Sequence, residues 1–262
     1  MNHNPVKSAI RQFGLPRIII VGFFIFLVIA AGGFQMNLMQ LLSDCVRRWG
    51  MFGILTLAMV PAVQCGIGLN FGISMGIVGG LLGGLIVIEL DVARIPALVA
   101  VGPMFGMWVS VLVAILIGVV LATGIGYLYG LLLNQVKGSE MTVTTYVGFS
   151  IIAFMNMLWM LLPFQNGELK WPNAGKGLRN TISLSTSFSG VMNDTLSFKI
   201  GNFTVPTGLL LFMFFMCLLV WLFMKSKTGM AMSAAGSNPM FAKAAGINVN
   251  RMRLVGTTLS TV

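Results

Sequence analysis

The chain has 262 residues, of which 57% are hydrophobic and only 8% are charged, and its formal net charge is +10. A soluble domain has about 25% charged residues, so this composition excludes one. Three cysteines without paired spacing exclude a disulfide scaffold, and the apolar content excludes a disordered chain. A polytopic helical membrane protein remains. We interpret the basic excess as orientation against the membrane and its anionic lipids, not as nucleic-acid binding.

Runs without charged residues locate the membrane spans, because roughly 20 apolar residues cross a bilayer as a helix. Most of these runs hold one span each, and the run 95–136 is interpreted as a single long, tilted span. The run 49–88 holds two spans, divided where glycines favour a break at 66–72. We therefore predict an all-α bundle in residues 1–224 with six spans, at about 17–33, 49–66, 72–90, 105–133, 143–163 and 205–224.

Small residues in the third predicted span indicate how the helices pack. The pairs Gly79-Gly80 and Gly83-Gly84 are four residues apart and so recur on one helix face. Because glycines let two backbones approach closely, we predict a helix-packing face there.

Lysine and arginine in the short loops set the expected orientation. Basic residues precede the first span, follow the fourth and follow the sixth: Lys7, Arg11, Arg17, Lys137, Lys225, Lys227, Lys243, Arg251 and Arg253. Six spans place all of them on one side, so both ends are expected in the cytoplasm. Arg47 and Arg48 beside the second span argue mildly for the reverse. An alternative is that the N-terminus is a cleaved secretory signal, because a basic, an apolar and a small-residue stretch follow in that order.

Two polar stretches interrupt the apolar pattern. Residues 164–204 form a predicted external loop, which is too long to be a mere connector. Residues 225–262 form a predicted cytoplasmic segment, in which apolar sequence resumes at Leu254–Val262. This last stretch is too short to cross a bilayer, so we expect it to begin a further span and the chain to be cut short.

Catalysis is not expected of this chain. The only histidine is His3, and the six acidic residues lie outside or at the edges of the charge-free runs. No metal cluster, nucleophile with a base, or phosphate-binding loop is evident. An ion-coupled carrier usually keeps an ionisable residue near mid-membrane, which this chain lacks, although backbone carbonyls at a broken helix could still bind sodium. An ATP-independent carrier or channel therefore stays open as the alternative to a chain powered by a separate protein.

The segment that follows the sixth span has the punctuation of a short helix. Pro239 stands at its expected start and Gly246 just past its end, with an amphipathic stretch, Met240–Ala245, between them. Such a helix can dock in a groove of a soluble partner. The alternative is an ordinary interfacial loop.

Residues Ala234–Arg251 carry a resemblance to a known family. Their sequence resembles the cytoplasmic coupling loop of ABC-importer permeases of the ribose/simple-sugar group, which is similar to the nucleoside and branched-chain amino-acid permeases. Lys227-Thr228-Gly229, Val205-Pro206, Gly66–Gly72 and Thr142–Phe154 fit the same pattern, so the resemblance runs from about Gly50 onward. The sugar permeases usually have Asp-Leu-Ser in the glycine stretch, where this chain has Leu69-Asn70-Phe71.

The resemblance implies a permease subunit of the bacterial inner membrane that imports a small polar solute, such as ribose. The implied partners are a second permease subunit, identical or different, an ATP-binding cassette subunit and an extracytoplasmic solute-binding protein. No cofactor is implied in this chain, because ATP and magnesium would sit in the ATPase. Nucleoside and branched-chain amino-acid transport stay open as alternatives.

Two sets of residues are candidates for these roles. The residues implied to couple the chain to the ATPase are Gly236, Asn238, Pro239, Met240, Phe241, Lys243, Ala244, Gly246, Ile247 and Arg251. A solute path needs polar groups inside the spans that exchange hydrogen bonds, and the candidates are Gln64, Asn70, Ser74, Thr145, Asn156 and Trp159. Asn156 and Trp159 are three apart and so share a helix face. The alternative for each of these polar residues is a hydrogen bond that holds two helices together.

Overall fold

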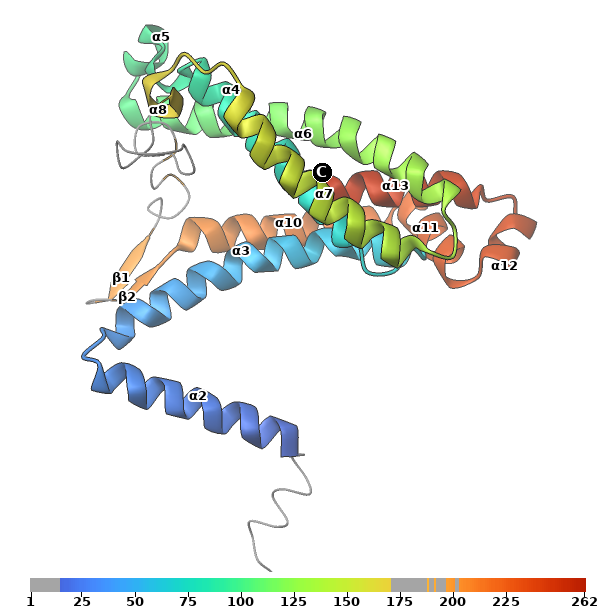
Figure 1. Ribbon diagram of the computed structural model, residues 1–262, viewed down its shortest axis with the longest axis horizontal. Helices are drawn as coiled ribbons and strands as arrows, with labels where there is room; N and C mark the ends of the chain where they lie inside the picture. Colours follow the sequence, from blue (N-terminus) through green and yellow to red (C-terminus); the bar gives the residue numbers. More distant parts are fainter. Residues whose placement is uncertain (1–14, 171–187, 189–190, 192–196, 201–202) are drawn as a thin grey trace, which may run out of the picture.

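The computed structural model describes residues 15–170, 188, 191, 197–200 and 203–262. Six of its helices are long and apolar enough to cross a membrane, which confirms the predicted all-α polytopic bundle. These helices are α2 (Leu15–Gly33), α3 (Leu38–Gln64), α4 (Ser74–Glu89), α6 (Pro103–Gln135), α7 (Glu140–Leu161) and α10 (Thr207–Lys225) (Figure 1). Two of the basic residues used to predict the orientation, Lys7 and Arg11, lie outside the described residues. Most of the predicted external loop does so as well.

The long fourth span is a single helix, as predicted. Helix α6 has 33 residues, which corresponds to about 50 Å of helix at 1.5 Å per residue. This length exceeds the hydrocarbon core of a bilayer, about 30 Å thick, so α6 is tilted or extends beyond it. The predicted division at 66–72 is also found, because α3 ends at Gln64 and a 3₁₀ turn, η1 (Phe71–Ile73), precedes α4.

Helix α3 begins eleven residues before the predicted start at 49, so that boundary was wrong. Asn37 caps the helix, because its side-chain oxygen accepts a hydrogen bond from the backbone N–H of Met39. The charged turn that the prediction placed in a loop is helical, and Arg47 pairs with Asp44 three residues earlier (3.6 Å). The charged residues interrupt the apolar sequence, but they do not interrupt helix α3.

Short elements connect the spans on the side of the α2–α3 turn. They are η2 (Val92–Arg94), α5 (Pro96–Val99) and α8 (Gly167–Lys170), together with an antiparallel pair, β1 (Phe198–Ile200) and β2 (Phe203–Val205). The strand pair is the end of the predicted external loop. It is tied to α3 because the Ser43 hydroxyl donates a hydrogen bond to the Thr204 carbonyl (2.5 Å).

Glycines form the contact between α4 and α6. A Cβ atom on Gly79 would lie 2.9 Å from Ala122, and one on Gly83 would lie 2.6 Å from the backbone of Gly118. Two helix backbones therefore touch here, which confirms the predicted packing face for these two glycines. A Cβ atom on the neighbouring Gly80 or Gly84 would meet nothing closer than 4.0 Å, although the Gly80 Cα lies 3.3 Å from the position of a Cβ on Gly118.

After α10 the chain forms α11 (Lys227–Ser237), α12 (Pro239–Ala244) and α13 (Val249–Thr261). The sequence did not predict α11, and α13 begins five residues before Leu254. Helix α13 lies along α6 (Figure 1), where Thr257 and Thr261 pack on Gly130 and Gly126. Helix α2 lies apart from the bundle and contacts mainly α3.

Candidate functional site

Local sequence determines both ends of α12, the predicted coupling helix. Asn238 caps its start, since its side-chain oxygen accepts a hydrogen bond from the Phe241 N–H (3.0 Å), and Pro239 occupies the first turn. Gly246 ends it with φ +81°. The N–H of Ile247 donates to the Ala242 carbonyl and that of Gly246 to the Lys243 carbonyl. This is the Schellman arrangement, in which glycine supplies the left-handed residue.

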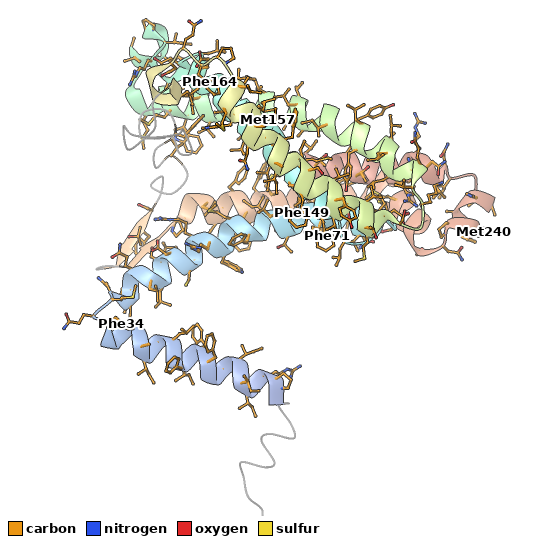
Figure 2. The ribbon with its side chains drawn as sticks, viewed as in Figure 1. Phe34, Phe71, Phe149, Met157, Phe164 and Met240 are labelled. Carbon is orange, nitrogen blue, oxygen red and sulfur yellow. The ribbon has the colours of Figure 1, made fainter. Side chains whose placement is uncertain are left out.

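One face of α12 is anchored and the other is free. Ala242 is fully buried against Ala235 of α11 and Val249 of α13. Met240 and Phe241 point the other way and are 78% and 67% exposed. Figure 2 shows Met240 at the tip of the molecule, on the side away from the bundle. The structure therefore exposes two large apolar side chains on a helix whose opposite face is packed against α11 and α13.

The surroundings of α12 are basic. Residues 225–262 contain five basic residues and no acidic one. Arg253 is neutralised by Glu140 of α7 in a largely buried ion pair (2.5 Å). Lys137 donates to the Asn250 side chain (2.6 Å). An open hollow of about 330 Å³ is lined by Lys137, Lys243, Gly246, Ile247, Asn248, Val249 and Asn250. An acidic or anionic surface is the electrostatic complement of this region.

Helix α11 connects this region to the break between α3 and α4. A Cβ atom on Gly236 would lie 2.1 Å from the Gln64 carbonyl oxygen, so the two backbones are in direct contact there. The Ser233 hydroxyl also donates to the Gln64 side-chain oxygen (2.9 Å). Gly236 was predicted to take part in coupling and Gln64 to line the solute path, and the structure brings the two together.

Asn70 lies just beyond this contact and is 0% exposed. Its side-chain oxygen accepts hydrogen bonds from the Tyr129 hydroxyl (2.7 Å) and from the Gly72 N–H (3.0 Å). Its amide nitrogen donates to the Ser260 hydroxyl (3.0 Å). Sequence reasoning missed Tyr129 and Ser260, because nothing in the sequence distinguishes them from other polar residues in apolar runs.

The other predicted solute-path residues are dispersed. Ser74 is buried and donates to the Gly148 carbonyl (3.2 Å), whereas Thr145 bonds within its own helix to Met141. Asn156 is exposed on α7. Trp159 packs edge-on against Phe164, with ring centroids 6.0 Å apart. Among the described residues no group of three or more His, Cys, Asp or Glu side chains could hold a metal ion. The solute-path roles stay predictions.

The fold and this surface define a multi-pass membrane protein, with six candidate spans in the described part of the chain and a structured segment after the sixth of them. Residues 17–262 match the family model described as the permease component of branched-chain amino acid transport systems. The chain belongs to this family of ABC-type permeases, and it is a transport component that is not itself catalytic. No curated protein and no solved structure gives a significant match.

Proposed function

We propose that this chain is the membrane-spanning subunit of an ATP-driven importer of the bacterial inner membrane, which moves a monosaccharide such as ribose into the cytoplasm. The observation that supports the proposal is the exposed apolar face of α12. Its exposed Met240 and Phe241 stand on a helix held by caps at both ends and by the buried Ala242. A groove in a soluble ATPase, apolar at its floor and acidic at its rim, is the partner that this helix fits.

A rigid-body motion of α12 would transmit the work of ATP hydrolysis from the ATPase to the membrane spans. Closure of the ATPase around ATP displaces α12, and the contacts of α12 with α11 and α13 carry the displacement to the bundle. A second permease subunit completes the pore, and an extracytoplasmic binding protein delivers the solute. Within the described spans the acidic residues lie near helix ends, with Asp44 in the first two turns of α3, Glu89 at the end of α4 and Glu140 at the start of α7. This placement away from the middle of the spans favours a separate energy source over coupling to an ion gradient.

Branched-chain amino acids are the second candidate cargo, because the matching family is described by that transport. The resemblance of Ala234–Arg251 to the sugar group favours the monosaccharide, and nucleosides are a further alternative in that resemblance. The permease sequence distinguishes these classes poorly, since a binding protein would select the solute.

The test is ATP-driven uptake by proteoliposomes that hold the native complex, with ribose, leucine and uridine as radiolabelled probes. Replacement Gly246→Val places a β-branched residue at φ +81°, which costs about 1–3 kcal/mol of strain and removes the C-terminal anchor of α12. We expect uptake to fall at least tenfold while membrane insertion is unchanged.

Gly138→Val is the matched control. Gly138 has φ +93° and, like Gly246, nothing within 4 Å of a Cβ atom, so it bears the same kind of strain in the α6–α7 turn. We expect this variant to retain most uptake. Uptake that persists without an ATPase would contradict the proposal, and the probe that accumulates identifies the cargo class.

A further inference from the structure

The segment between α3 and α4, residues Cys65–Ile73, is clamped from two sides; we call it the interrupted segment. On one side the backbone of Gly236 in α11 packs on Gly66, where a Cβ would lie 2.9 Å from it. On the other side Gly256 of α13 packs on the buried Cys65, at 2.6 Å by the same measure. Even a methyl group at either glycine would collide with its neighbour, so α11 and α13 pack directly against the segment.

The same two helices hold α12. Ala235 of α11 and Val249 of α13 form the apolar cluster around Ala242. Helices α11 and α13 are therefore each in contact with both α12 and the interrupted segment. The segment is suited to respond, because Gly66 and Gly68 have φ +80° and +90° and only the three-residue η1 is helical within it.

Asn70 ties this segment to the rest of the bundle. Its hydrogen bonds reach Tyr129 on α6 and Ser260 on α13. We call Asn70, Tyr129 and Ser260 the Asn70 node. Because an unpaired buried polar group costs about 1–3 kcal/mol, the node strongly favours the arrangement in which all its bonds are made. A different position of the segment must break the node or replace it.

We propose that the interrupted segment relays the displacement of α12 to α4 and α6, and that Asn70 is the positioning residue that holds the segment in the state described here. The inference rests on the proposed function, because it takes the ATPase to be what moves α12. It assigns Asn70 a conformational role, consistent with a side chain that is fully buried and bonded in this state.

Three cysteine reporters labelled with bimane test the relay in the native permease–ATPase complex. Ser237→Cys reports on the α11–α12 junction, Leu69→Cys on the interrupted segment, and Phe34→Cys on the α2–α3 turn at the opposite end (Figure 2). The exposed Cys45 and the partly buried Cys217 are replaced by serine. The unmodified background measures any labelling of the buried Cys65.

MgATP with orthovanadate is expected to shift the bimane emission at Ser237→Cys and at Leu69→Cys and to leave Phe34→Cys unchanged. A silent Ser237→Cys reporter overturns the proposed function together with the relay. A response at Ser237→Cys without one at Leu69→Cys overturns the relay alone, as does an equal response at all three positions.

Tyr129→Phe tests the node, because it removes one hydroxyl and keeps the ring. Without nucleotide, the Leu69→Cys emission is expected to move toward its ATP value, with the equilibrium displaced about 3- to 10-fold. Tyr127→Phe is the matched control, since Tyr127 lies on the same helix and is exposed, and it is expected to change nothing.

Ser260→Ala removes another partner of Asn70 and is expected to shift the same equilibrium in the same direction. If Tyr129→Phe does not assemble with the ATPase, Ser260→Ala tests the Asn70 node in its place. If Tyr129→Phe or Ser260→Ala assembles with the ATPase and its Leu69→Cys emission equals that of the Tyr127→Phe control, the positioning role of Asn70 is overturned.

Discussion

Phe241 exposes a large apolar side chain in the segment that follows the last candidate span of the described residues. It follows the basic end of α10 by sixteen residues and lies on the outer face of α12, two-thirds exposed. Full burial of a phenylalanine side chain is worth about 1.5–3 kcal/mol, so a partner that covers this face gains from it. Aromatic residues in such positions commonly dominate an interface.

Phe241→Ala should therefore weaken the binding of the ATPase subunit more than any loss of charge nearby. We expect the Kd, measured by titration of the ATPase onto the permease in nanodiscs, to rise by roughly 30-fold, which corresponds to about 2 kcal/mol. Met230→Ala on α11 is the control, because Met230 is comparably exposed and lies outside the predicted coupling set. Equal losses for the two variants would show that α12 is not the docking surface.

The sequence identified α12 because the signals are local. Asn238 and Pro239 mark its start and Gly246 its end, all within nine residues, and each adopts the capping role that its residue type favours. The Asn70 node could not be predicted in this way. Tyr129 lies 59 residues from Asn70 and Ser260 lies 190 residues away, and only the fold brings them together.

Apolar periodicity and length located the helices well, but not their ends. The start of α3 was missed because a charged turn was taken as a boundary, whereas arginine is a good helix former and Asp44 pairs with Arg47. Helix α11 was missed because its composition is neither strongly apolar nor charged. Its start is fixed by Ser226, whose hydroxyl accepts a hydrogen bond from the Gly229 N–H (3.2 Å).

The contact between α4 and α6 depends on which glycine of each pair faces the partner helix. Gly83→Val should place its side chain against the backbone of α6, 2.6 Å from the Gly118 nitrogen, and lower the free energy of unfolding by about 1–3 kcal/mol through overpacking. Gly80→Val carries the same change in helix propensity at a position with open space. Thermal unfolding in detergent should show a lower Tm for Gly83→Val alone. Equal Tm values would contradict this packing face.

At the scale of the whole molecule, the two ends of the bundle have different character. One end holds α12 and the basic residues near it, together with the α6–α7 turn and the interrupted segment. The other end holds the α2–α3 turn and the β1–β2 pair (Figure 1). Basic residues in short loops favour the cytoplasmic side, so the end with α12 is expected to face the cytoplasm, where ATP is available.

Cysteine accessibility tests this orientation directly. In a background without Cys45 and Cys217, Phe34→Cys is expected to react with a membrane-impermeant maleimide added to intact cells, because Phe34 is 80% exposed at the end away from α12. Met240→Cys should react only after the cells are permeabilised. Ser139→Cys in the α6–α7 turn should behave like Met240→Cys, since the hydrogen bond from Lys137 to Asn250 places this turn beside the start of α13, which follows α12. The reverse pattern would place α12 outside, out of reach of any ATPase, and the proposed coupling would fail with it.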